Sequence, residues 1–131
     1  MDEQILLAIR NSDIESIQDF LTVIQAESIY KLIIAFGGSQ LIIPRTYNEK
    51  YKGTQSLKIT IGEDEARKLI TTYSLCQIYI PKLDRIISKI RDENIYKEYY
   101  SGCSYNQLAQ RYNMATRSIR NIIDKINGGK R

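Results

Sequence analysis

The stretch SYNQLAQRYNMATRSIRNII, residues 104–123, decides the interpretation of this chain because it predicts two short helices that cross at a tight turn. Leu108 and Ala109 are expected to face inward, and Ala109 is small where the second helix crosses. Asn113 falls where the backbone must turn through a left-handed conformation, which Gly and Asn adopt most readily. The remaining core positions would be Met114, Ile119 and Ile122. This spacing is typical of a DNA-binding helix-turn-helix.

The start of the first of these helices is marked by a capping box. Ser104 and Gln107 form an S-x-x-Q pattern, which predicts a helix that continues through Tyr112. The second start is weaker, because Ala115 stands where such motifs often carry a Ser or Asp cap. Thr116 would cap instead, which shifts the second helix by one residue. The alternative is a helical hairpin that only packs and binds no DNA.

The exposed face of the second helix supplies the residues expected to read bases. Arg117 and Arg120 can each donate two hydrogen bonds to guanine, and Asn121 can pair in the same way with adenine. Thr116 and Ser118 are expected to contact phosphates or methyl groups. The side chains expected to neutralise phosphates, which position the domain without reading sequence, are Lys97, Arg111 and Lys125. Ser104 completes this part of the predicted DNA-binding set.

Charge is distributed unevenly along the 131 residues. Residues 1–81 hold 8 Lys and Arg against 10 Asp and Glu, a net −2, whereas residues 82–131 hold 11 against 5, a net +6. The second half is therefore the candidate for binding a polyanion. We predict a dimerisation region over 1–81 and a helix-turn-helix DNA-binding domain over 82–131.

Several other classes of protein are disfavoured by the composition. Cys76 and Cys103 form no C-x-x-C pair, and the chain has no His to complete a zinc site, so we expect no metal and no cofactor. The absence of His and of a phosphate-binding Gly-rich motif also argues against an enzyme. The longest apolar run, 32–36, is too short to cross a membrane, and no signal peptide is visible. We expect a cytoplasmic, nucleoid-associated protein with no membrane contact.

A repeat appears when the chain is compared with itself at an offset of 37 residues. Residues 27–45, ESIYKLIIAFGGSQLIIPR, align with residues 64–82, DEARKLITTYSLCQIYIPK. The identical pairs are Lys31/Lys68, Leu32/Leu69, Ile33/Ile70, Gln40/Gln77, Ile43/Ile80 and Pro44/Pro81. Each copy predicts a helix followed by a short strand that a proline ends. The alternative is chance similarity between two Ile-rich segments.

The remaining elements follow from periodicity and turn residues. We predict helices over 3–10, 12–24 (with Ser12 and Glu15 as a capping box), 27–36, 63–74, 83–90 and 92–100. We predict strands over 40–43, 57–61 and 77–80, and a polar, flexible stretch over 46–55. The fold class is therefore mainly α with short β-strands: an N-terminal helical dimerisation region with a strand linker, and a C-terminal helix-turn-helix.

Three segments together resemble the Mor transcription activator family, the middle-operon activators of transposable phages and their prophage relatives. They are QIYIPK at 77–82, RDENIY at 91–96 and YNQLAQRYNMATRSIRNII at 105–123. The resemblance implies a homodimeric activator of phage or mobile-element genes that binds an inverted repeat and recruits RNA polymerase. One feature departs from the family: the Gly-Gly expected before the strand is Ser74-Leu75, while Gly37-Gly38 precedes the upstream copy.

The strands need partners, because an isolated strand of four or five residues is not stable. Strands 40–43 and 77–80 could pair with each other, with 57–61, or with a symmetry mate. In each case Ile78 and Ile80 share one face. Gln77 and Tyr79 share the other, where they could contact the DNA backbone or minor groove; alternatively, Tyr79 only shields the core.

An apolar stripe along the first helices predicts assembly. It consists of Ile5, Ile9, Ile14, Ile17, Leu21, Ile24, Ile29, Leu32, Ile33 and Phe36. This is more apolar surface than about 40 residues are expected to bury alone, so we predict an obligate homodimer with residues 13–36 in the interface and strand 77–80 near the two-fold axis. The alternative functions are an accessory DNA-binding subunit of a recombinase or transposase, and an anti-repressor that binds protein.

Overall fold

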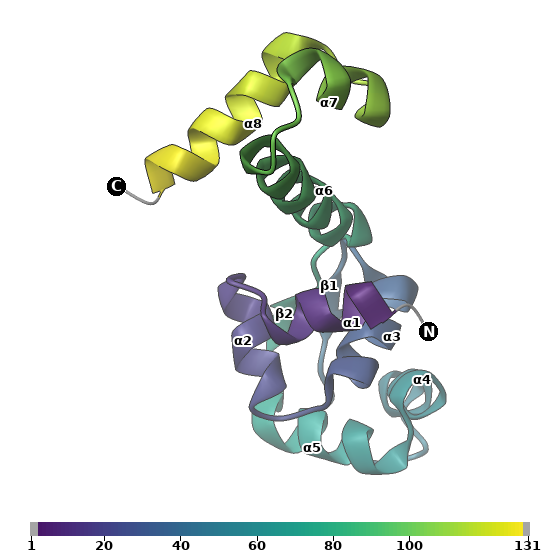
Figure 1. Ribbon diagram of the computed structural model, residues 1–131. Coiled ribbons are helices and arrows are strands. Elements are labelled where there is room, and N and C mark those ends of the chain that lie inside the picture. The colour runs from purple at the N-terminus through teal and green to yellow at the C-terminus, as the bar shows by residue number, and fades with distance from the viewer. Residues whose placement is uncertain (1–2, 130–131) are drawn as a thin grey trace. The chain divides into compact units, whose positions relative to one another are not determined.

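The computed structural model describes residues 3–129 and confirms a mainly helical fold with one small antiparallel sheet (Figure 1). The chain forms two compact units that divide between Ile86 and Ile87. The division falls within one helix, α6 (Leu83–Tyr100). Each unit has its own buried core, so each is described separately.

The first unit contains five helices and the sheet. Its elements are α1 (Glu3–Arg10), α2 (Glu15–Leu21), α3 (Ala26–Phe36), β1 (Gln40–Ile42), α4 (Lys52–Ile61), α5 (Glu63–Tyr73) and β2 (Gln77–Tyr79). The predicted helices at 3–10, 27–36 and 63–74 are confirmed to within one residue at each end, as are the strands at 40–43 and 77–80. Helix α5 begins with the acidic residues Glu63, Asp64 and Glu65. Their negative charges interact favourably with the positive end of the helix dipole.

The predicted strand at 57–61 is wrong, because these residues belong to helix α4. Leu57 and Ile61 lie four residues apart on one face of the helix and are buried together with Thr54, while Ile59 is 85% exposed. The apparent alternation of Leu57, Ile59 and Ile61 therefore came from one residue that faces solvent. Thr54 completes the buried face. Because threonine is a polar residue, the sequence did not identify position 54 as part of an apolar helix face.

The predicted capping box at Ser12 and Glu15 is also wrong. The Ser12 hydroxyl accepts a hydrogen bond from the Ile14 N–H at 3.1 Å, which forms a tight turn before the helix instead of a cap on it. Helix α2 begins at Glu15 after an extended Ile14, and it ends at Leu21, three residues earlier than expected.

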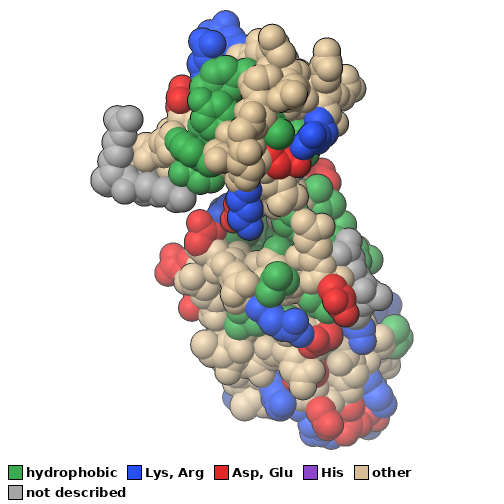
Figure 2. Space-filling model, viewed as in Figure 1, with side chains coloured by type: hydrophobic (Ala, Val, Ile, Leu, Met, Phe, Trp, Pro, Cys, Tyr) green, Lys and Arg blue, Asp and Glu red, His purple; other side chains and the backbone are tan. Residues whose placement is uncertain are grey.

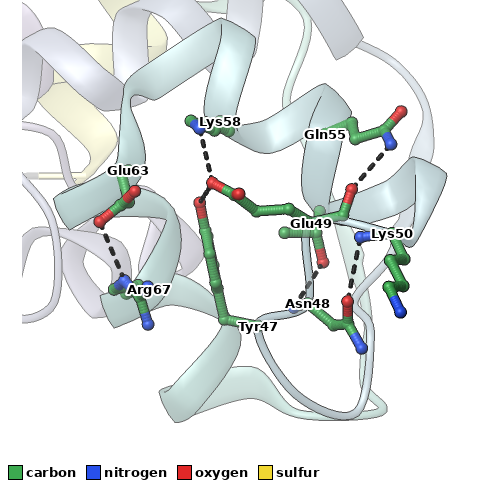
Figure 3. A network of polar contacts seen from close by, with 9 residues as sticks. Tyr47, Asn48, Glu49, Lys50, Gln55, Lys58, Glu63 and Arg67 are labelled. Carbon is green, nitrogen blue, oxygen red and sulfur yellow. Dashed lines mark hydrogen bonds and ion pairs between the residues drawn. The ribbon is translucent and has the colours of Figure 1, made fainter.

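The stretch predicted to be flexible, 46–55, is an ordered connection followed by the first turn of α4 (Figure 3). Glu49 accepts hydrogen bonds from the Tyr47 hydroxyl and from Lys58, and its backbone carbonyl accepts one from Gln55 at 2.7 Å. The Arg67 guanidinium lies 4.1 Å from the centre of the Tyr47 ring. Polar residues here tie the connection to α4 and α5, so polarity did not signal flexibility.

The two strands pair with each other, which is the first of the three pairings considered above. Leu41 lies opposite Ile78, flanked by the pairs Gln40/Tyr79 and Ile42/Gln77. The predicted alternation is confirmed, since Ile78 and Ile80 are buried while Gln77 and Tyr79 are exposed. The exposed face of the sheet carries Gln40, Ile42, Gln77 and Tyr79.

The dimer prediction starts from the premise that about 40 residues cannot bury the apolar stripe alone, but the cover comes from the rest of the same chain. Eight of its ten residues are buried within the single chain: Ile5, Ile9, Ile14, Ile17, Ile24, Ile29, Leu32 and Ile33. Helix α3 packs against both α1 and α4, so residues beyond the first 40 contribute to the cover. The homodimer itself stays a prediction.

The second unit contains most of α6, then α7 (Tyr105–Tyr112) and α8 (Thr116–Gly129). Helix α6 is continuous, so the predicted break into helices at 83–90 and 92–100 is wrong. The fully buried core consists of Ile95, Leu108, Ile119 and Ile123. Ile123, not the expected Ile122, closes the core, because it lies four residues after Ile119 on the same helix face; Met114 and Ile122 are only partly buried.

Candidate nucleic-acid interface

The predicted capping box at the start of α7 is confirmed. The Gln107 N–H donates to the Ser104 hydroxyl at 3.1 Å, and the Ser104 N–H donates to the Gln107 side-chain oxygen at 2.9 Å. Two backbone donors that the helix start leaves unpaired are therefore satisfied reciprocally. Ser104 therefore caps the start of α7. The residue is also exposed, and its predicted DNA contact stays a prediction.

The turn between α7 and α8 has the predicted left-handed residue. Asn113 has φ 52° and ψ 51°, a conformation in which a β-branched residue would be strained. The Met114 N–H donates to the Ala109 carbonyl at 2.9 Å and ends α7. Helix α8 begins at Thr116, and the Ala115 carbonyl accepts its first hydrogen bond, from the Ile119 N–H. The expectation that Thr116 caps the helix is wrong, because Ala115 holds that position without a side-chain cap.

The outward face of α8 carries a row of exposed polar and basic side chains. Arg117 and Asn121 lie one turn apart and point away from the buried Ile119, since residues two positions from it are about 200° around the helix. The other exposed predicted contacts on α8 are Thr116, Arg120 and Lys125, and Ser118 is half-buried. Within residues 3–129, Arg117, Arg120 and Lys125 show no ion pair. The helix therefore presents hydrogen-bond donors to solvent along one side.

Aromatic contacts fix the position of Arg120. Its guanidinium lies 5.2 Å from the centre of the Tyr105 ring, and Tyr105 stacks on Tyr99 with 5.0 Å between ring centres. A cation over an aromatic face is attracted to the ring while its N–H groups stay free in the guanidinium plane. Arg120 is thus held beside the start of α7, toward one edge of the exposed face of α8.

Arg111 lies in a different environment from the one expected of a free phosphate ligand. It donates to the Glu98 carboxylate at 2.8 Å, and the Tyr112 hydroxyl donates to the other carboxylate oxygen at 2.6 Å. The bond from Tyr112 and the pair with Arg111 hold the pKa of Glu98 below its ordinary value, although burial opposes this. Burial and the bond to Glu98 raise the pKa of Tyr112 to about 12. Glu98 therefore links α6 to α7, a role that no sequence signal indicated.

The other predicted contact residues are placed as follows. Lys97 is exposed in the last turn of α6, within the second unit. Gln77 and Tyr79 are exposed on β2, within the first unit, where Tyr79 is 45% exposed. On the face drawn in Figure 2, basic and acidic side chains are interspersed over the first unit, so this face of the unit is not uniformly basic or uniformly acidic.

One known protein family matches a long continuous part of the chain. The Mor transcription activator family matches residues 48–130, which is more than half of the chain. The chain belongs to the Mor transcription activator family. The matched segment begins just before α4 and runs through α5, β2, α6, α7 and α8, so this Mor protein carries α1, α2, α3 and β1 outside it. No curated protein and no solved structure matches the chain.

The family assigns the protein to the transcription activators, which are not known as enzymes. Residues 3–129 contain no cluster of three or more side chains suited to hold a metal ion. In the same range, no helix has the length and apolar character needed to span a bilayer.

Proposed function

We propose that this Mor protein activates transcription by binding double-stranded DNA sequence-specifically, with α7 and α8 as a helix-turn-helix and α8 in the major groove. The observation that carries the proposal is the outward face of α8, where Arg117, Arg120 and Asn121 are exposed and both arginines are free of ion pairs among the described residues. An arginine on a helix that is free of ion pairs can form two hydrogen bonds to guanine without first breaking a bond within the protein.

The positions of the side chains rank them. Arg117 and Asn121 point away from the core on adjacent turns, so we assign base reading to them first, and to Arg120 at the flank. We assign phosphate contacts to Lys125, Lys97, Thr116 and Ser118, and to Ser104 at the start of α7. Arg111 would have to leave Glu98 to reach a phosphate, so its contribution is expected to be smaller.

The wider setting follows from the family and is part of the proposal. The protein would bind at promoters of phage or other mobile-element genes, in the cytoplasm, and recruit RNA polymerase. The alternatives are an accessory DNA-binding subunit of a recombinase and an anti-repressor that binds protein. An activator and an accessory recombinase subunit both require α8 to bind DNA, whereas an anti-repressor does not. Of the three, only an activator raises transcription from a promoter that carries its site.

The test is selection of binding sites from random DNA with the full chain, followed by gel-shift measurements on the selected site. Arg117→Ala should weaken specific binding by roughly 1–3 kcal/mol and relax the preference at one base pair. Lys50→Ala removes one charge from an exposed position in the first unit and is the matched control. Failure to select any sequence would refute the proposal, and equal weakening on specific and random DNA would make Arg117 a phosphate contact.

A further inference from the structure

The sequence repeat corresponds to a structural repeat in the first unit that is longer than the identical residues. The segment α2–α3–β1 and the segment α4–α5–β2 have the same element order. At the offset of 37 residues, Glu15 at the start of α2 aligns with Lys52 at the start of α4, and the bounds of β1 align with those of β2. Buried positions align as well: Ile17/Thr54, Phe20/Leu57, Ile24/Ile61, Ile29/Ala66, Leu32/Leu69, Ile33/Ile70 and Ile43/Ile80. We name residues 15–45 the first copy and residues 52–82 the second copy.

The strand register relates the two copies by a local two-fold axis. A two-fold axis passes midway between equivalent residues, so an antiparallel pair built on it must place one residue opposite its own equivalent. Leu41 lies opposite Ile78, which is its equivalent at the offset of 37. The flanking bonds are images of each other: the Ile43 N–H donates to the Cys76 carbonyl at 2.9 Å, and the Ile80 N–H donates to the Ser39 carbonyl at 3.0 Å.

A second contact lies on the same relationship, away from the strands. The Ser28 hydroxyl donates to the Glu65 carboxylate at 2.8 Å, and Ser28 and Glu65 are again equivalent positions. The copies also pack across each other, since α3 contacts α4 and the Phe20 ring meets the Tyr73 ring edge-on with 5.7 Å between centres. Two separate pairs of equivalent residues, Leu41/Ile78 and Ser28/Glu65, are therefore in contact, as a local two-fold axis requires of residues that lie on it. The helix packing is not fully symmetric, because α3 packs against α4 more extensively than α2 packs against α5.

We propose that the first copy occupies, within one chain, the place that a second chain would take beside the second copy, so that the protein works as a monomer. The family match begins at residue 48 and includes the second copy with α7 and α8 but not the first copy. A three-residue strand such as β2 needs a partner, and β1 provides it. One chain then holds a paired strand unit but a single α7–α8 pair.

The consequence for DNA rests on the proposed function. A monomer with one α7–α8 pair reads one half-site, so its binding site needs no inverted repeat. This replaces the two-fold symmetric site that a homodimer would require. The pairing of the two copies does not depend on DNA binding and is tested separately.

The pairing is tested by a disulfide across the exposed face of the sheet, in the full chain. Ile42 and Gln77 lie opposite each other, between a pair joined by a backbone bond at Ile43 and Cys76 and the pair Leu41/Ile78. They are therefore a non-hydrogen-bonded pair, in which side chains approach most closely. The variant carries Ile42→Cys and Gln77→Cys, with Cys76→Ser and Cys103→Ser to remove the native thiols.

On mild oxidation this variant should close an internal crosslink and keep the mass of one chain at every concentration tested in the ultracentrifuge. The off-register control, Gln40→Cys with Gln77→Cys in the same background, should stay open. Disulfide-linked dimers of the first variant would show that β1 pairs with β2 of another chain and would overturn the proposal. A two-chain mass of the unmodified protein at low concentration would also overturn it.

Footprinting on the selected DNA site tests the second half. One protected half-site without internal symmetry is the expected result. Protection of two symmetric half-sites by two chains would overturn the monomer while leaving the proposed function intact. If no DNA is bound, the proposed function and its single half-site fail together, and the crosslink still decides the pairing.

Discussion

The two copies in the first unit share a backbone but differ in the residues that produce it. The first copy turns from helix to strand through Gly37-Gly38, and the second does so through Ser74-Leu75. Gly37 and Ser74 have φ of −53° and −42°, while Gly38 and Leu75 both have positive φ, at 83° and 61°. The family departure at Ser74-Leu75 is thus a change of residue at an unchanged turn. Buried apolar positions and strand pairing impose this turn, and Gly only makes it cheaper.

The comparison also shows where the copies have diverged. Ile17 in α2 corresponds to Thr54 in α4, and both side chains are fully buried. Ser28 in α3 corresponds to Glu65 in α5, and these two meet each other. Helix α1 packs against α3 and has no counterpart in the second copy, since the offset places it on β1. Divergence is tolerated where a neighbour supplies the missing contact.

The largest effect is expected in the equivalent core positions Leu32 and Leu69, which are 1% and 0% exposed. Leu32→Ala and Leu69→Ala should each lower the free energy of unfolding by about 2–5 kcal/mol, through lost transfer energy and an unfilled cavity. If the two copies unfold together, the two variants should lose similar stability, and each should show a single urea transition. Two successive transitions in either variant would mean that the copies unfold independently, and the comparison between them would fail.

The site where the copies differ in charge should give the next effect. The Glu65 carboxylate accepts from the Gln25 N–H and the Ser28 hydroxyl, both at 2.8 Å, at the start of α3. Burial raises the pKa of Glu65, but these bonds and Lys68 outweigh it, so the pKa is below its ordinary value. Glu65→Ala leaves the Gln25 N–H without this partner and should cost roughly 1–3 kcal/mol near neutral pH.

The pH dependence follows from the sign of that shift. A lowered folded pKa adds stability that is fully present above the unfolded value of about 4.3 and is lost as pH falls through the folded pKa. Glu65→Gln should therefore flatten the loss of stability on acidification, measured by thermal unfolding across that range. Glu63→Gln is the matched control, because Glu63 is in an exposed pair with Arg67 worth about 0.3–0.5 kcal/mol. If both variants changed the pH dependence equally, the contact of Glu65 with Gln25 and Ser28 would not be the source of the effect.

Local features were predictable from the sequence, and contacts between distant segments were not. Asn113 and the Ser104/Gln107 box were predicted because each satisfies backbone groups within four residues of itself. The Glu98–Arg111 pair depends on how α6 packs against α7, for which the sequence carries no pattern. Burial of the apolar stripe was missed for the same reason, since α4 lies against α3 only in the folded chain.

The missed helix α4 was within reach of the sequence. Leu57, Ile59 and Ile61 alternate as in a strand, and over five residues the two periods are hard to distinguish. Extending the repeat upstream at the same offset, however, aligns 52–61 with 15–24, which lies inside the helix that the Ser12/Glu15 pattern predicts over 12–24. Comparison of the copies would have outweighed the short alternation.

A smaller effect is expected at the turn of the first copy. At Gly38 the backbone has φ 83°, and an added Cβ would lie 2.9 Å from Lys82 Cε. Gly38→Leu, which gives the first copy the residue of the second, should cost about 1–2 kcal/mol from the left-handed backbone, plus the displacement of the Lys82 side chain. Lys82→Ala in the same background should recover the displacement part only. Full recovery would assign the cost to crowding instead of backbone conformation.

The smallest effect, and the only gain, is expected at the turn of the second copy. Leu75 has φ 61° and is 69% exposed, so its side chain contributes little packing to offset the left-handed backbone. Leu75→Gly removes about 1–2 kcal/mol of strain but increases the entropy of the unfolded chain by roughly 0.4–1 kcal/mol. The net result should be a stabilisation of roughly 0–1.6 kcal/mol, measured by urea unfolding. Leu75→Ala, which keeps a Cβ, should give no such gain. A loss of stability in Leu75→Gly would show that the exposed leucine makes a contact that its equivalent, Gly38, cannot make, and the two turns would then differ in energetics despite their common backbone.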